Sequence, residues 1–210
     1  MSGQIFVTGD IHGSAGVYRF THSGIFVGGK PNKGDVVLVA GDWSMPFIDP
    51  KIDDEALDKF AAFPWIFAFI DGNHENFPRL YSYPEEEHFG GPVGVLRANI
   101  FHLKRRGHVY NINGKSFWCF GGACSHDKIG RIKEVSGWPE EEPTDTVKEY
   151  GIAQLAKYGH VDYMLTHDCP FSLCEMNPRL FKSHTVIPSN SNLYLDAAAK
   201  AGRADLWLFG

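Results

Sequence analysis

The segment DVVLVAGD, Asp35 to Asp42, combines the two patterns that decide the fold of this 210-residue chain. Its apolar run is typical of a strand buried on both faces, and the run ends in a glycine and an acid. The same form recurs in QIFVTGD (4–10), WIFAFIDGN (65–73), VDYMLTHD (161–168) and DLWLFG (205–210). We therefore expect five buried strands that end in small, acidic or imidazole residues.

The segments between these strands indicate helices and hairpins. Helical spacing of apolar residues predicts helices over Asp53–Phe63 and Thr144–Tyr158, with Thr144 as the N-cap. Residues 99–123 alternate apolar and polar side chains around Arg106-Gly107 and Asn113-Gly114, which predicts hairpins. An α/β fold follows, in which two sheets pack face to face with helices outside. No linker interrupts the chain, so we expect one domain over residues 1–210.

Composition and charge exclude several classes of function. The net charge of -5 and pI near 6.0 give no general attraction to nucleic acid, and LKRRGH (103–108) is too short for a basic patch. No run approaches the roughly 18 apolar residues of a membrane span, and residues 1–7 do not form a signal peptide. We expect a soluble, cytoplasmic protein without a membrane or nucleic-acid partner. The sequence indicates no oligomeric state.

The four cysteines permit two interpretations. Cys119 and Cys124 have C-x4-C spacing, as do Cys169 and Cys174, which is wider than the usual zinc-binding C-x2-C pair. A four-cysteine zinc site is the less favoured interpretation. Ordinary thiols in a reducing compartment are the favoured one.

Polar donors follow the predicted strands at four places, namely Asp10 and His12, Asp42, Asn73 and His74, and His167. A single acid at a strand end is more often a core residue that neighbouring backbone satisfies. Four sets at one sheet edge would repel and desolvate one another unless cations compensated them, which predicts a metal site. Oxygen and imidazole donors without thiolate suit Mn²⁺, Fe or Zn²⁺ better than Ca²⁺. Two ions about 3.5–4 Å apart could share a carboxylate and activate a water for phosphate-ester hydrolysis.

The ordered motifs D-x-H, G-D, G-N-H-E and H resemble those of the calcineurin-like metallophosphoesterases. The resemblance covers nearly the whole chain and implies a four-layer αββα sandwich of two mixed sheets, with a dinuclear centre at the carboxyl ends of the strands. It implies Asp10 and His12 as ligands of one ion, Asp42 as a bridge, and Asn73 and His167 as ligands of the other. It also implies that His74 faces the substrate, where it stabilises the phosphoryl group or protonates the leaving oxygen.

The expected activity is hydrolysis of a small phosphate ester or nucleotide by a hydroxide that two divalent ions activate. Phosphomonoesters and phosphodiesters both stay open, and so do dinucleoside polyphosphates and nucleic acids as diester substrates. A scaffold of the same fold without catalysis is a further alternative. The segment GDWSMP lacks the arginine that the protein serine/threonine phosphatases carry after this motif, which argues against a phosphoprotein substrate.

Several other residues allow two interpretations. His126, Lys128 and Arg131 could reach a substrate phosphate, or could lie in a polar hairpin loop. Trp43 and Phe47 could line a pocket for a base or aryl group, or belong to the core. Glu75 could orient His74 or a metal ligand, or be an acid in the first turn of a helix, which is favoured. Asp168 could support His167, and the predicted role of residues 140–142 is a solvated loop.

The last six residues end at the start of one more motif of the resembled family. The glycine of DLWLFG matches the first residue of a final G-H-x-H motif, which in the resembled family supplies one histidine to each ion. We expect the natural chain to continue past Gly210 into that motif. The alternative is a natural protein that lacks these two ligands.

Overall fold

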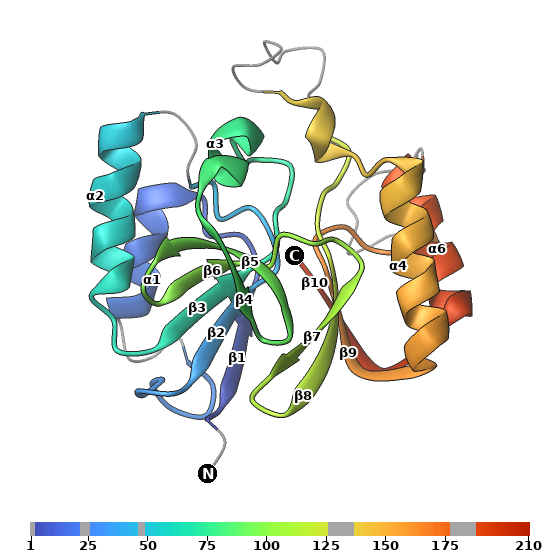
Figure 1. Cartoon of the computed structure of the whole chain (residues 1–210), viewed down its shortest axis with the longest axis horizontal. Coiled ribbons are helices and arrows are strands. Elements are labelled where there is room, and N and C mark those ends of the chain that lie inside the picture. Colours follow the sequence, from blue (N-terminus) through green and yellow to red (C-terminus); the bar gives the residue numbers. More distant parts are fainter. Residues whose placement is uncertain (1–2, 22–25, 46–48, 126–136, 177–187) are drawn as a thin grey trace.

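Two sheets, one of six strands and one of four, form the centre of the computed structural model (Figure 1), which describes residues 3–21, 26–45, 49–125, 137–176 and 188–210. The six-stranded sheet has the order β1-β2-β3-β6-β5-β4. Its first four strands in that order are parallel, and β5 and β4 are antiparallel additions. The bounds are β1 Ile5–Thr8, β2 Val36–Val39, β3 Ile66–Phe69, β4 Glu85–His88, β5 Gly91–Arg97 and β6 Ile100–His102.

The four-stranded sheet has the order β10-β9-β8-β7. Strands β10, β9 and β8 are parallel, and β7 pairs antiparallel with β8. The bounds are β7 His108–Ile112, β8 Lys115–Phe120, β9 His160–Thr166 and β10 Arg203–Phe209. All five strands expected from the sequence are therefore present, and four of them end in the predicted polar motifs.

Helices cover the outer faces of both sheets (Figure 1). Helices α1 (Val17–Thr21) and α2 (Pro50–Ala61) pack on the six-stranded sheet, and α4 (Asp145–Tyr158) and α6 (Asn190–Ala201) pack on the four-stranded sheet. A third apolar cluster lies between the two sheets and includes Leu38, Phe101 and Phe117. The expected αββα order of layers is confirmed. The short helices α3 (Phe77–Ser82) and α5 (Phe171–Met176) follow β3 and β9.

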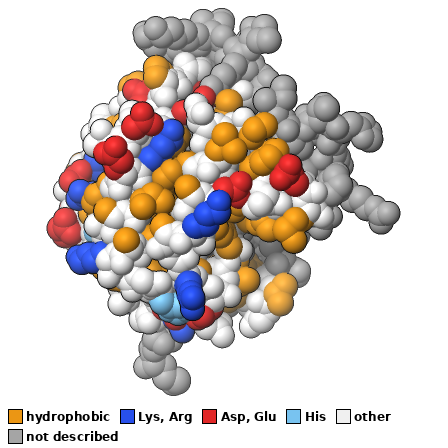
Figure 2. Space-filling model, turned by 90° about the vertical axis from the view of Figure 1, so that its right-hand side faces the viewer, with side chains coloured by type: hydrophobic (Ala, Val, Ile, Leu, Met, Phe, Trp, Pro, Cys, Tyr) orange, Lys and Arg blue, Asp and Glu red, His pale blue; other side chains and the backbone are white. Residues whose placement is uncertain are grey.

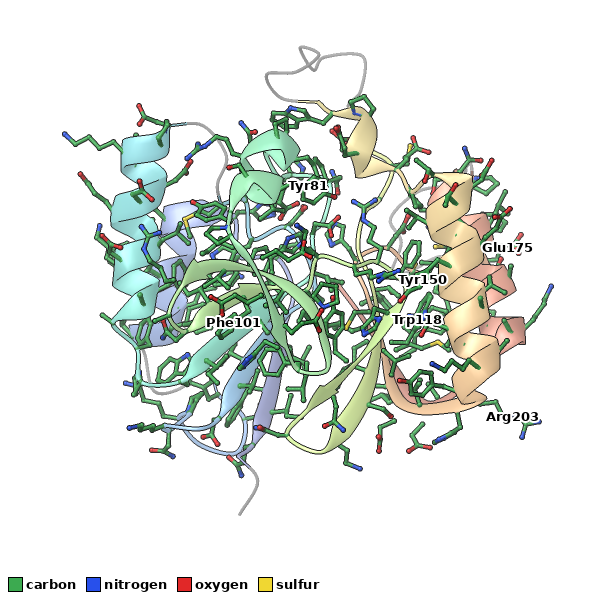
Figure 3. All side chains as sticks on the ribbon, viewed as in Figure 1. Tyr81, Phe101, Trp118, Tyr150, Glu175 and Arg203 are labelled. Atoms are coloured by element: carbon green, nitrogen blue, oxygen red, sulfur yellow. The ribbon has the colours of Figure 1, made fainter. Side chains whose placement is uncertain are left out.

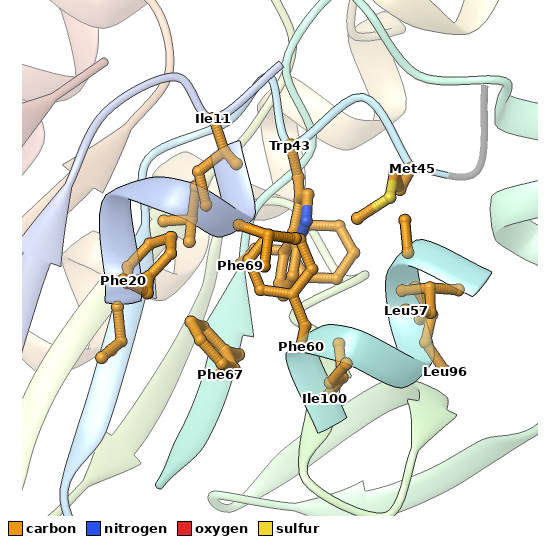
Figure 4. Packing of buried hydrophobic residues seen from close by; sticks show 14 of the residues in the cluster. Ile11, Phe20, Trp43, Met45, Leu57, Phe60, Phe67, Phe69, Leu96 and Ile100 are labelled. Carbon is orange, nitrogen blue, oxygen red and sulfur yellow. The ribbon is translucent and has the colours of Figure 1, made fainter. Parts of the chain in front are cut away.

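Aromatic side chains fill the layer under α1 and α2. Figure 4 shows Trp43 against Phe60, Phe67 and Phe69, with ring centroids 4.8–5.4 Å apart and mostly edge-to-face contacts. Each such side chain contributes about 1.5–3 kcal/mol when it leaves water. Trp43 is fully buried, so the core interpretation of this residue is the correct one. Phe47 lies outside the described residues.

Helix α4 approaches the four-stranded sheet closely because Gly151 faces Gly107. A Cβ on Gly107 would lie 2.4 Å from Cα of Gly151, so neither position has room for a side chain. The indole Nε1 of Trp118 donates to the carbonyl oxygen of Gly151 at 3.2 Å, on the face of the sheet that α4 covers (Figure 3). Thr144 caps the helix as predicted, because its hydroxyl accepts from the backbone N–H of Val147.

Two predicted features need correction. Arg106-Gly107 does not form a hairpin: β6 belongs to the six-stranded sheet and β7 to the four-stranded one, so this turn carries the chain between sheets. Asn113-Gly114 does form the predicted hairpin between β7 and β8, with φ of 48° and 81°. Strand β10 is also less buried than expected. It lies at a sheet edge with Leu206 and Phe209 exposed.

The surface carries charges of both signs. On the face that Figure 2 shows, lysine and arginine side chains are interspersed with acidic and apolar ones. Among the described residues, no helix is long and apolar enough to cross a membrane.

Candidate metal centre

The carboxyl ends of β1, β2, β3 and β9 meet at one edge of the sandwich. They bring five predicted site residues to the wall of one cavity of about 420 Å³, namely Asp10, Asp42, Asn73, His74 and His167. The end of β10 lies at the same edge, where the N–H of Gly210 donates to the carbonyl oxygen of His167 at 3.2 Å (C in Figure 1). The parallel arrangement of these strands thus explains how motifs far apart in sequence meet.

Two glycines make room for this convergence. A Cβ at Gly41 would lie 2.3 Å from Nδ1 of His167, and a Cβ at Gly72 would lie 2.1 Å from Oδ1 of Asp42. The residues beside the first glycine are strained, since Asp42 and Ser44 have φ of 47° and 57°. Non-glycine residues in this region cluster at functional sites, where the surrounding structure must hold them in place.

Asp42, which follows β2, accepts hydrogen bonds from the loops that follow β1 and β3. Its Oδ1 accepts the backbone N–H groups of Asn73 and His74, both at 2.9 Å. Its backbone oxygen accepts those of Ile11 and His12 at 3.1 and 3.0 Å. The loops that follow β1 and β3 are therefore both positioned by the residue that follows β2.

His167 presents a lone pair to the cavity. Its Nδ1 lies 2.9 Å from the carbonyl oxygen of Ala40, which can only accept, so Nδ1 carries a proton, and in the neutral imidazole Nε2 then offers its lone pair. Nε2 faces Oδ1 of Asn73 at 3.0 Å and Oδ1 of Asp42 at 3.4 Å. All three atoms carry lone pairs that point together. That arrangement is repulsive alone and favourable around a cation.

A second observation supports a fit to metal. Oδ1 of Asp10 is buried and has no hydrogen-bond partner in the described part of the chain. Asp10, Asp42 and His167 each offer a ligand atom within 4.8 Å of the others. They form the only such group of three or more His, Cys, Asp and Glu residues within the described ranges. The chemistry of these donors suits a divalent ion.

His12 and His74 lie at the mouth of the site. Their rings make an edge-to-face contact with centroids 5.6 Å apart. Nε2 of His12 is 3.5 Å from Oδ2 of Asp10, and Nε2 of His74 is 3.9 Å from Oδ2 of Asp42. The two side chains are 53% and 36% exposed, so both can meet a molecule that enters from solvent.

Comparison with known proteins agrees with this geometry. A family model described as calcineurin-like phosphoesterase matches residues 3–210. The chain belongs to this family. Searches of curated proteins and of solved structures gave no significant match to the phosphoesterase. Membership implies a metal-dependent hydrolase that acts on phosphate esters.

The structure corrects the favoured interpretation of Glu75 as an acid in the first turn of a helix. Helix α3 of the phosphoesterase begins at Phe77 with Asn76 as its N-cap, so Glu75 lies before the helix. The side chain is fully buried and accepts the N–H groups of Gly72 and Ser44 at 2.8 and 3.3 Å. Burial, and then the nearby charges of Asp42 and Asp71, raise the pKa of Glu75. It holds the two loops that carry Asp42 and Asn73.

Asp168 forms part of the cavity wall with the start of α6. It accepts from the backbone N–H of Cys169 and from Nδ2 of Asn192, at 2.8 and 2.5 Å. Burial raises the pKa of Asp168, and these hydrogen bonds oppose that shift. Ser189 and Asn192 line the cavity beside it. No sequence signal indicated these two residues, because they precede and open an ordinary amphipathic helix.

Three further expectations have mixed outcomes. All four cysteines are free thiols, and they form no four-cysteine cluster, although Sγ of Cys169 lies 3.2 Å from Sγ of Cys174. The predicted solvated loop at residues 140–142 is wrong for Glu141, which is 2% exposed. The candidate substrate residues lie outside the described residues; they are His126, Lys128 and Arg131.

Proposed function

We propose that this phosphoesterase hydrolyses phosphate esters of small molecules or nucleotides with the help of two divalent ions. The observation that carries the proposal is the convergence of Nε2 of His167 with the side-chain oxygens of Asn73 and Asp42. Buried donors arranged in this way need a cation, and a cation beside an open cavity can bind a phosphoryl oxygen.

The ligands divide between two ions. Asp10 and His12 would hold one ion, Asn73 and His167 the other, and Asp42 both. Mn²⁺, Fe and Zn²⁺ suit this set of oxygen and nitrogen donors. When bound, the ions would supply positive charge to the phosphoryl group and lower the pKa of a water.

His74 would act on the substrate rather than on the metal. Its ring reaches the cavity, and its backbone N–H is held by Asp42. A protonated imidazole there can donate to a phosphoryl oxygen or to the leaving oxygen, and such assistance typically contributes a factor of about 10²–10⁴ in rate. His126, Lys128 and Arg131 stay predicted contacts to the substrate phosphate.

A phosphodiesterase is the second candidate function, and the shape of the site supports it. A further cavity of about 320 Å³ is also bordered by His74, and His12, Ser44, Met45 and Ile52 are among its other lining residues. A diester has two ester groups, so one could occupy each cavity, whereas a monoester needs one.

We further propose that residues 1–210 form a single domain, in which Gly210 borders the metal centre. This glycine lies against the site: a Cβ there would be 2.3 Å from the oxygen of Ala40 and 2.8 Å from Nδ1 of His167. The free thiols favour a cytoplasmic protein.

The test is Mn²⁺-dependent hydrolysis of an aryl phosphate monoester and of the matching diester. It compares the 210-residue chain with a chain that includes any residues encoded after Gly210. We expect hydrolysis that chelation abolishes. Faster turnover of the diester would favour the phosphodiesterase. No hydrolysis by either chain, combined with weak metal binding, would favour the scaffold alternative.

A further inference from the structure

A chain of hydrogen bonds joins the proposed metal ligand Asn73 to a buried carboxylate in another part of the fold. Nδ2 of Asn73 donates to Oγ of Ser125 at 3.0 Å, and that hydroxyl donates to Oε2 of Glu141 at 2.5 Å. Ser125 and Glu141 are 4% and 2% exposed. The contacts connect the end of β3 with the segment after β8 and with the short 3-10 helix Pro139–Glu141.

The direction of each hydrogen bond follows from chemistry. A carboxylate only accepts, so the single hydroxyl proton of Ser125 goes to Glu141. The hydroxyl oxygen is then left as an acceptor toward Asn73, and the group of Asn73 that faces it must be the NH₂. Oδ1 of Asn73 therefore points the other way, where it lies 3.0 Å from Nε2 of His167.

We propose that Glu141 is a positioning residue for metal binding, which through Ser125 fixes the Asn73 amide with its oxygen toward the ion. The inference rests on the proposed role of Asn73 as a ligand. An amide can present either its oxygen or its NH₂ to a cavity, and only the oxygen can bind a cation. Groups that orient a ligand in this way typically change metal affinity by about 10–100-fold.

Glu141 is itself held firmly. Its other oxygen, Oε1, accepts the backbone N–H of Trp138 at 3.0 Å. The carbonyl oxygen of the preceding residue, Glu140, accepts from the guanidinium of Arg106 at 2.8 Å, and Arg106 forms a buried ion pair with Asp71. The N–H of Trp138 thus holds the side chain of Glu141, and Arg106 holds the backbone just before it. A residue that positions another needs to be fixed in this way.

These contacts make Glu141→Gln an informative substitution. The N–H of Trp138 requires an acceptor, so it would keep the glutamine oxygen at the Oε1 position. The glutamine NH₂ would then face Ser125, whose hydroxyl would accept from it and donate to Asn73 instead. Asn73 would turn its oxygen toward Ser125 and its NH₂ toward the metal. The change in side-chain volume is negligible, yet the relay is reversed.

The experiment titrates Mn²⁺ into the metal-free full chain by calorimetry. We expect E141Q to weaken binding by about 10–100-fold. The matched control is E140Q, which removes the same charge from an exposed neighbour and should bind as the unaltered chain does. Ser125→Ala should weaken binding as E141Q does, and Ser125→Thr, which keeps the hydroxyl, should restore it. In S125A the Asn73 side-chain amide protons should also exchange faster with solvent, as ¹H–¹⁵N spectra would report.

Equal affinities of E141Q and the unaltered chain, or no Mn²⁺ binding by either, would overturn the inference. So would unchanged amide exchange in S125A, a measurement that needs no metal. Thermal unfolding of each metal-free variant separates a fold defect from a binding defect. If E141Q binds Mn²⁺ weakly but the unaltered chain hydrolyses no phosphate ester, the proposed function alone is rejected. If the unaltered chain is active and E141Q binds Mn²⁺ as tightly as it does, the positioning role alone is rejected.

Discussion

Nε2 of His167 lies 3.4 Å from Oδ1 of Asp42, although the two residues follow strands of different sheets. When the imidazole is neutral, neither atom carries a proton that could bond them to each other, because Nδ1 of His167 donates to Ala40 and the carboxylate is an acceptor. With a neutral imidazole, the contact between the two sheets at this edge is therefore unfavourable until a cation lies between the two atoms. Metal binding and stability should be linked through this pair.

The first prediction concerns Asp42→Asn. Removing this buried negative charge relieves repulsion in the metal-free protein, where Asp42 also raises the pKa of Glu75. We expect the metal-free variant to be about 0.5–1 kcal/mol more stable in urea unfolding, because destabilised functional sites often gain stability when altered. Addition of Mn²⁺ should stabilise the unaltered chain and leave the variant unchanged.

Glu87→Gln is the control for this change, since Glu87 lies exposed on β4 far from the cluster. It should alter neither the stability of the metal-free protein nor its response to Mn²⁺. A strongly destabilised Asp42→Asn variant would show that the carboxylate is needed for the fold itself.

The second prediction separates His74 from the metal ligands. His74→Ala should reduce kcat for an aryl phosphate by about 10²–10⁴-fold, because the variant lacks the proton donor. Its affinity for Mn²⁺ should match that of the unaltered chain. A loss of metal together with activity would falsify the assignment of His74 to the substrate and make it a ligand.

The third prediction tests the buried ion pair between Arg106 and Asp71. Burial opposes ionisation of Asp71, but Arg106 and then His102 outweigh it and hold the pKa of this carboxyl well below its usual range. Arg106→Met removes the ion-pair partner of this buried carboxylate, which keeps its contact with His102, and should cost about 3–5 kcal/mol in urea unfolding. Arg105→Met, on the exposed neighbour that stacks on Tyr150, should cost less than about 1 kcal/mol. Equal losses in the two variants would contradict the prediction.

The fourth prediction concerns pH and His102. Burial lowers the pKa of this imidazole against the opposing pull of Asp71, and Arg106 and Lys104 lower it further. The unfolded state, with a histidine pKa near 6.5, therefore binds the proton first, and folding stability contributed by His102 falls as pH drops from about 7 to 5. The fall is at most about 1.4 kcal/mol per pH unit for one proton.

His102→Gln keeps a donor toward Asp71 and does not titrate. The stability difference between the unaltered chain and this variant should shrink on acidification, as urea unfolding at pH 7, 6 and 5 would measure. Other histidines contribute equally to both proteins, so they cancel in the difference. A stability difference that stays constant from pH 7 to pH 5 would show that the pKa of His102 is the same in the folded and unfolded states.

The fold and the main site could be predicted because their signals are local. Each strand is followed within a few residues by its functional residue, as β2 is by Asp42, and parallel strands bring such ends together. The turn at Arg106-Gly107 was misinterpreted because turn chemistry does not say which sheet the next strand joins. Glu141 was misinterpreted because its burial depends on Ser125, distant in sequence, and a short acidic run resembles solvated loops.

The meeting of Asp10, Asp42 and His167 also orders events during synthesis. Asp10 and Asp42 leave the ribosome well before His167, which follows β9. Until then, the nascent protein offers a metal only part of its donor set, with the weak and unselective affinity of an open acidic loop. The proposed donor set that would select the ion is consequently complete only after β9 has been made, and it would draw on the metals that surround the chain at that stage.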